Sequence, residues 1–236
     1  MTGVELSFLW SSWGLLLLNG FGMTIVLTVI CAFFALIIGF VVGTSRWARI
    51  RLLEPVLVAY VEAARNTPPL VQILFWYFSA SFIFPRPVVL WLLDIGLPFS
   101  AAVIALSLYH GAFVAEVVRA GLNAVASGQY EAARALGLRF VPMMRAVVMP
   151  QVVRIAMPSL ANELISLAKG TSLALAIGVA ELSFQAKYIE TYAFRGVEAL
   201  MGATVLYLLL CLGIAGIGRL VSRRLPAPPG YELQEH

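Results

Sequence analysis

Few residues of this 236-residue chain have side chains and spacings that support catalysis. Neither lysine stands in G-x-x-x-x-G-K-[ST], the loop that cradles nucleotide phosphates, so we expect no ATPase site. The two cysteines and two histidines lack metal-ligand spacing, and neither H-E-x-x-H nor a Ser/His/Asp arrangement occurs. We therefore expect no catalytic residue, no metal site and no cofactor in this chain, and we interpret His110 as a satisfied interior histidine.

The polar residues that could bind a ligand stand inside apolar stretches, where a charged side chain is costly and by default indicates a functional site. At the first such place the chain reads Arg65-Asn66-Thr67-Pro68-Pro69. The two prolines break the backbone hydrogen-bond ladder. Thr67 suits an N-cap and Pro68 a first helical residue, so we predict that a half-helix begins there with N–H groups free to bind a carboxylate. The alternative is a proline kink in which Arg65 pairs with Glu62.

A second group of polar residues recurs at helical spacing further along the chain. Four of them share one face of a helix: Ser159, Glu163, Ser166 and Gly170. Small and polar residues on one stripe line a helix interface or a pathway. Glu163 could contact an ammonium group, and the alternative is a buried pair with Lys169 or Arg65. The predicted ligand contacts are therefore Arg65, Asn66, Thr67, Glu163, Ser166 and Gly170.

These residues require helices that lie in a membrane. The chain is 61% hydrophobic and 12% charged, whereas soluble domains are roughly 45–50% apolar and about 25% charged. A hydrocarbon core of about 30 Å needs roughly 20 helical residues to cross it. We predict an all-α integral membrane protein, a single domain over residues 1–236 with five transmembrane helices at about 15–46, 52–82, 98–122, 155–180 and 197–222.

The distribution of basic residues predicts the orientation. Eleven arginines follow the first, third and fifth spans, and three Lys or Arg residues stand on the opposite side. Short loops rich in Lys and Arg stay in the cytoplasm, so we place the N-terminus outside and the C-terminus in the cytoplasm. The same rule explains the net charge of +4, and we expect no nucleic-acid partner. Ser7–Leu18 is predicted as an interfacial approach helix and Pro226–His236 as a short cytosolic tail.

The longest polar connection, about residues 123–152, has the pattern of two short helices with a glycine corner. Good helix formers over Gln129–Leu136 end at Gly137, which suits a left-handed C-cap. A second helical stretch over Val141–Val148 is predicted to end before Pro150. Considered by its local chemistry alone, the segment could also be an ordinary amphipathic surface loop.

This connection resembles the "EAA" loop of ABC-importer permeases. The matching positions are Glu131-Ala132-Ala133, Gly137 after three residues, and Val147-x-Met149-Pro150 after nine more, where the family usually has Ile-x-Leu-Pro. In that family the loop forms coupling helices that dock into a cleft of the ATP-hydrolysing subunit. The resemblance implies this role for Glu131, Ala132, Ala133, Gly137 and Pro150. Ala132 and Ala133 would form a small-residue face for close packing.

Three further segments resemble the polar amino acid branch of the family, type I importers with an EAA loop. They are Tyr60–Gln72, similar to Y-x-E-x-x-R-x-T-P-L-L-V-Q, then Ala115–Gly121 and the run Asn162–Glu181. Members often have Lys-Asp-Thr-Ser where this chain has Lys169-Gly170-Thr171-Ser172. The missing acid makes a strongly dibasic substrate a weaker expectation.

The resemblance implies a multi-pass permease subunit of the bacterial inner membrane, in an ATP-driven importer of polar L-amino acids. Glutamate, aspartate or glutamine is the favoured substrate class, with basic amino acids or opines, or a secondary transporter, as alternatives. Five spans are too few to enclose a path, so a second permease subunit, identical or related, is expected. The other implied partners are two ATPase chains, an external solute-binding protein, the amino-acid substrate and lipid.

Overall fold

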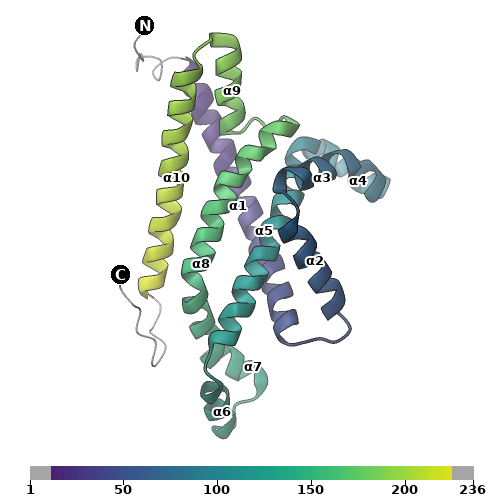
Figure 1. The fold of residues 1–236 in the computed structure, drawn as a ribbon, viewed down its shortest axis with the longest axis vertical. Coiled ribbons are helices and arrows are strands. Elements are labelled where there is room, and N and C mark those ends of the chain that lie inside the picture. Colours follow the sequence, from purple (N-terminus) through teal and green to yellow (C-terminus); the bar gives the residue numbers. More distant parts are fainter. Residues whose placement is uncertain (1–11, 225–236) are drawn as a thin grey trace.

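The computed structural model describes residues 12–224, and every regular element within them is helical (Figure 1). The elements in chain order are α1 (Ser12–Trp47), α2 (Glu54–Asn66), α3 (Pro69–Ile83), α4 (Arg86–Ile95), α5 (Leu97–Ala124), α6 (Ser127–Ala135), α7 (Phe140–Met143), the π-helical turn η2 (Met144–Val148), α8 (Met149–Gly170), the 3-10 helix η3 (Thr171–Ile177), α9 (Leu182–Ala193) and α10 (Gly196–Arg224). The prediction of an all-α membrane protein is confirmed. The predicted tail after residue 225 and the first part of the predicted approach helix lie outside the described residues.

Four stretches of the described chain are long and apolar enough to cross a membrane by length and composition: Trp13–Trp47, Leu97–Ala124, Phe140–Ile177 and Gly196–Arg224. The segment predicted as one span at 52–82 consists of α2 and the shorter apolar helix α3. The segment predicted at 155–180 differs more, because α8 begins at Met149 and changes to a 3-10 helix after Gly170. Residues 12–18 continue α1 and form no separate approach helix.

Small residues bring α1 and α5 into close contact along their length. A Cβ atom on Gly39 would lie 2.3 Å from Val114 Cγ1, and one on Gly43 would lie 2.5 Å from the carbonyl oxygen of Ala115. Glycine lets two membrane helices approach at the backbone, which increases van der Waals contact. The α1–α5 pair therefore forms the central support to which α2, α3 and α8 are added (Figure 1).

Two short helices, α4 and α9, were not predicted from the sequence. A glycine with positive φ lies near one end of each: Gly96 directly after α4, with φ of +107°, and Gly178 before α9, with φ of +84°. Figure 1 places α9 beside the beginnings of α1 and α10, at the end of the molecule opposite α6. Both are shorter than a membrane span, so length and hydropathy gave no signal for them.

The buried carboxylate of Glu181 fastens α9 to its neighbours. It accepts hydrogen bonds from the backbone N–H groups of Ser183 (2.9 Å) and Phe184 (2.8 Å), which makes it the N-cap of α9. It also accepts from Tyr207 Oη of α10 (2.7 Å) and Thr24 Oγ1 of α1 (3.5 Å). Burial raises the pKa of Glu181 above its ordinary value. One side chain therefore ties α9 to the next helix, α10, and to α1, which is distant in the sequence.

Candidate functional site

The predicted break in the second span is present, but its N-cap is one residue later than predicted. Thr67 and Pro68 are extended, and α3 begins at Pro69 with Pro68 in the N-cap position and no side-chain cap. Each proline drives the residue before it out of the helical region, so the pair removes two residues from the helix instead of one. The prediction that Thr67 caps a helix beginning at Pro68 is therefore wrong, whereas the break itself is confirmed.

The backbone groups freed by this break are bonded by the side chain of Gln72. Its Nε2 donates to the carbonyl oxygens of Ala64 (2.8 Å) and Thr67 (3.1 Å), at the end of α2. These carbonyls lack helical partners, and an unbonded carbonyl at membrane depth is costly. Gln72 therefore holds α2 and α3 in a fixed relation, a role that the sequence analysis did not assign.

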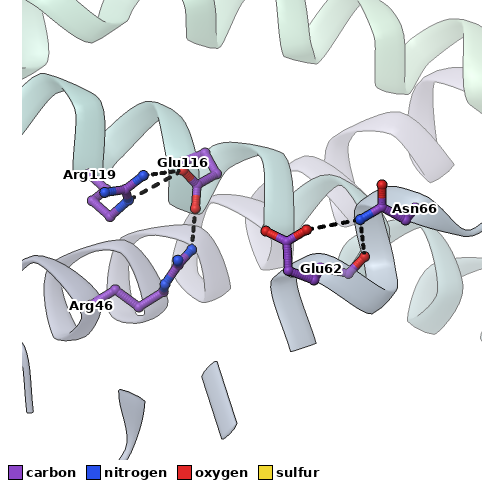
Figure 2. Close-up of polar contacts among 5 residues, drawn as sticks. All are labelled: Arg46, Glu62, Asn66, Glu116 and Arg119. Atoms are coloured by element: carbon purple, nitrogen blue, oxygen red, sulfur yellow. Dashed lines mark hydrogen bonds and ion pairs between the residues drawn. The ribbon is translucent and has the colours of Figure 1, made fainter. Parts of the chain in front are cut away.

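Arg65 does not pair with Glu62, the alternative that the spacing allowed. Glu62 instead accepts a hydrogen bond from Asn66 Nδ2, which lies 2.9 Å from Oε2 and also donates to the Glu62 carbonyl (Figure 2). The guanidinium carbon of Arg65 lies 5.3 Å from the ring centroid of Phe113 on α5, a cation–π distance. Within residues 12–224, Arg65 forms no ion pair with a carboxylate. Its charge remains available to a ligand.

The predicted ligand-contact residues Glu163 and Gly170 of α8 lie against His110 of α5. Glu163 Oε1 lies 2.5 Å from His110 Nδ1, a hydrogen-bond distance, and only 2% of the histidine side chain is exposed. On the other edge of the ring, a Cβ atom on Gly170 would lie 3.3 Å from Nε2. His110 is thus the satisfied interior histidine expected from the sequence. Its partner is Glu163, which was expected to pair with Lys169 or Arg65 or with a ligand.

The two predicted groups of ligand contacts, one at the break after α2 and one on α8, therefore lie against adjacent turns of α5. Phe113, which stacks on Arg65, is three residues after His110, a rise of about 4.5 Å along a helix. The Tyr109 ring contacts both, with centroids 5.0 Å from His110 and 5.1 Å from Phe113. Ser166 lies on the exposed side of α8. Tyr109 and Phe113 were not predicted as site residues, because aromatic residues in an apolar helix carry no signal that separates a site from the core.

An ionic network joins α1 and α5 near the end that leads to α6. Glu116 accepts from Arg46 on α1 and, at 2.7 Å, from Arg119 Nη2 one turn further along α5 (Figure 2). Glu116 and Arg119 are three residues apart on one helix, a spacing at which side chains meet and can pair. Arg46 was not expected in the network, since the two helices are distant in sequence.

The connection between α5 and α8 forms two short helices with a corner. Gly137 has φ of +74°, the left-handed conformation that the sequence predicted. Glu131 and Ala132 face outward, whereas Ala133 is buried against the loop's own core. The expected shared face of Ala132 and Ala133 is therefore wrong, because successive helical residues point about 100° apart. The exposed side instead presents Leu136, which is 81% exposed.

The second half of the loop continues into the membrane, contrary to the prediction that it ends before Pro150. From Phe140 the chain stays helical through η2 and into α8, where Pro150 is in the first turn. Proline lacks a backbone N–H and its ring crowds the preceding turn. The π-helical turn widens the helix just before it, which is a known way to insert an irregular residue into a helix.

Residues 12–224 contain no group of three or more His, Cys, Asp or Glu side chains that could hold a metal ion. The features that are present are apolar helices of spanning length, a broken helix whose polar side chains converge on α5, and a two-helix loop at one end. Such a combination defines a membrane permease subunit. Comparison with known proteins agrees: the chain belongs to the family of binding-protein-dependent transport system inner membrane components, whose model matches residues 35–226.

Relatives and solved structures specify the family further. A glutamate transport system permease protein (GluC) of Corynebacterium efficiens is 38% identical over 226 residues, covering 92% of this chain and 98% of that one. A glutamine transport system permease protein (GlnP) of Escherichia coli K12 is 34% identical over 211 residues, covering 89% and 93%. A crystal structure of an amino acid ABC transporter with histidines matches with a TM-score of 0.80 and 32% identity, over 95% of this chain and 100% of that one.

The chain is therefore the non-catalytic permease subunit of an ABC importer for amino acids, located in the inner membrane. Permeases of this family work with an ATPase and a binding protein. These findings confirm the family resemblance and the transport function inferred from the sequence.

Proposed function

We propose that this permease conducts polar L-amino acids with acidic or neutral side chains, namely glutamate, aspartate or glutamine. The residues proposed to contact the substrate are Arg65, Asn66, Thr67, Glu163, Ser166 and Gly170. In this proposal Arg65 receives the α-carboxylate, and the oxygen of Glu163 that does not bond His110 receives the α-ammonium group.

The main support for the proposal is that Arg65 and Glu163 differ in whether they already have a partner within the protein. Arg65 has no carboxylate partner among residues 12–224, whereas Glu163 is already engaged by His110. Lys169 on α8 adds a second exposed cation, and Gly170 supplies no acid beside the His110 ring. The excess of unpaired positive charge at these residues favours a substrate with more negative than positive groups. The glutamate and glutamine permeases among the relatives support the same class.

The alternative is a basic amino acid or an opine, and uptake measurements separate the two. The permease would be reconstituted with its ATPase and binding protein, and uptake of labelled glutamate, glutamine and arginine compared. Arg65→Gln should reduce glutamate uptake at limiting substrate roughly tenfold to a hundredfold, because a hydrogen bond to a charged group contributes about 1.5–3 kcal/mol. Arg86→Gln, an equal charge change on α4, is the control. Uptake of arginine alone by the wild type would overturn the proposed substrate class.

For the coupling loop we propose that α6 and α7 dock on the ATPase. The residues in this role are Glu131, Ala132, Ala133, Gly137 and Pro150. Support comes from the outward position of Glu131 and from exposed apolar side chains beside it, Leu136, Phe140 and Val141, which a partner surface would cover. The loop then lies in the cytoplasm, with the N-terminus outside, as the basic residues predict. A second permease subunit and two ATPase chains complete the assembly, and nucleotide is bound only by the ATPase, so this chain holds no cofactor.

Charge reversal at Glu131 tests the docking. Glu131→Lys should lower substrate-stimulated ATP hydrolysis and co-purification of the ATPase, while membrane insertion of the permease is retained. Asp94→Lys, the same change at an exposed position on α4, serves as the control. A Glu131→Lys transporter with normal assembly and coupling would count heavily against the docking role.

A further inference from the structure

A cavity of about 590 Å³ lies between α1, α3, α4 and α5 and has no part in the proposed substrate path. Its lining is hydrophobic apart from the hydroxyl groups of Ser100 and Ser107. The Ser100 hydroxyl donates to the Leu92 carbonyl oxygen, so it is already bonded. The cavity opens to the outside beside exposed lining residues, among them Trp91, which is 61% exposed. An opening of this kind on a membrane helix bundle faces lipid.

The cavity and the proposed substrate contacts lie at different levels of α5. The lining of the cavity on α5 ends at Leu108, whereas His110 and Phe113, which contact Glu163 and Arg65, follow further along the helix. None of the six proposed substrate contacts lines the cavity. A polar amino acid in the cavity would also lose its water without gaining hydrogen bonds, which is costly. The cavity therefore requires a different kind of ligand.

The shape of the cavity defines what fits. On α5 the lining extends from Phe99 to Leu108, about 14 Å along the helix, and on α1 it extends from Ile30 to Ile38, about 12 Å. This length is close to half of the hydrocarbon core of about 30 Å, which is the depth of one leaflet. Dividing the volume by the length gives a cross-section of about 42 Å², or a width of about 7 Å.

We propose that this groove binds one acyl chain of a phospholipid from the leaflet at the α4 end of the membrane. The groove covers the first half of α5, away from the ionic network at Glu116 and Arg119, so the chain enters from the interface and ends near the bilayer centre. Trp91 and Trp76 line its walls, and tryptophan is enriched where membrane meets water. The bound chain fills the space between α4 and α1 and thereby stabilises α3 and α4 against α5.

Photolabelling tests the proposal. The permease with its partner subunits would be reconstituted in vesicles of phosphatidylethanolamine and phosphatidylglycerol that include a phospholipid with a diazirine near the end of one acyl chain. After irradiation, label should concentrate on residues 103–108, the inner end of the groove on α5, several-fold above the lipid-exposed face of α10. Val103→Trp, which fills the groove, should remove that excess. Val205→Trp on the exposed face of α10 is the matched control and should leave the excess unchanged.

Two further variants separate the acyl chain from other occupants. The Ser107 hydroxyl lines the cavity and has no hydrogen-bond partner in the described part of the chain, so a polar ligand would use it. Ser107→Ala should leave the labelling unchanged, and loss of labelling would overturn the proposal in favour of a polar ligand. Disulfide formation between two copies of a Phe34→Cys variant would overturn it in favour of a second subunit.

A stability measurement covers the case in which Val103→Trp distorts the fold. In detergent, added phospholipid should raise the Tm of the wild type and of Val205→Trp, and it should raise the Tm of the smaller filling variant Val103→Phe much less. An equal rise in all three proteins, or labelling spread evenly over the membrane-facing helices, would refute a specific acyl-chain site.

Discussion

Replacing Glu181 by alanine should destabilise the permease, since three helices share this carboxylate. The change removes the N-cap of α9, which typically contributes about 1 kcal/mol. It also removes one partner of the partly buried Tyr207 hydroxyl, which keeps Ser183 Oγ at 3.0 Å, and such a loss costs about 1–2 kcal/mol. Release of a buried carboxylate offsets part of this sum, so we expect a net loss of about 1–2 kcal/mol. The Tm should fall by roughly 2–8 °C.

The assay is thermal unfolding in detergent, followed by tryptophan fluorescence. Glu190→Ala is the control, because Glu190 is an acid on the same helix whose ion pair with Lys187 is solvent-exposed and contributes little. A Tm for Glu181→Ala within the range of the Glu190→Ala control would refute the assignment of Glu181 as the residue that holds α9.

The pH dependence of the same measurement tests the charge state of Glu181. Burial raises the folded-state pKa of Glu181 above the ordinary 4.5, so the folded protein holds this proton more tightly than the unfolded chain does. The resulting stabilisation is complete below pH 4.5 and is lost as the pH rises through the folded-state pKa. Glu181→Gln keeps an acceptor oxygen and cannot titrate. The wild type should therefore lose Tm relative to Glu181→Gln as the pH rises, and a gain would contradict the reasoning.

Three other substitutions test the contacts that support the site, each by Tm in detergent. Gly39→Ala should cost about 1–3 kcal/mol because its Cβ would collide with Val114, whereas Gly22→Ala, with no atom within 4 Å, should cost nothing. Gln72→Ala should cost about 1–3 kcal/mol, since two carbonyl oxygens at the helix break lose their donor, and an unchanged Tm would exclude that role. Glu116→Gln should cost about 1–3 kcal/mol, less than a fully buried pair, because the network is partly exposed.

Features encoded locally in the sequence were predicted well. Apolar length located α1, α5 and α10, two adjacent prolines located the break after α2, and a glycine among helix formers located the corner at Gly137. Each of these depends on the conformational preferences of a few consecutive residues. Short helices gave no such signal, because α4 and α9 are stabilised by packing and by the distant partners of Glu181.

Contacts between distant residues explain most of the errors at the candidate site. Glu163 has a histidine partner 53 positions away, and a single sequence gives no measure of that proximity. Arg65 does not pair with Glu62, because the side chain of Asn66 reaches back one helical turn and donates a hydrogen bond to the Glu62 carboxylate. The prediction that the helix ends before Pro150 failed for a different reason. A proline is tolerated in the first turn of a helix, and the wider π-helical turn before it leaves room for its ring.

The continuous helix from Phe140 to Gly170 gives the proposed coupling a physical route. Its first residues belong to the loop proposed to dock on the ATPase, and Glu163 on the same helix bonds His110 at the proposed substrate contacts. Met149 and Glu163 are fourteen residues apart, about 21 Å along a helix. A helix is stiff over that distance, so a displacement of the loop moves Glu163 and Gly170 against the fixed α1–α5 pair. Between them lie the π-helical turn at Met144–Val148 and Pro158 inside α8, and these irregular points are where such a movement would be absorbed or transmitted.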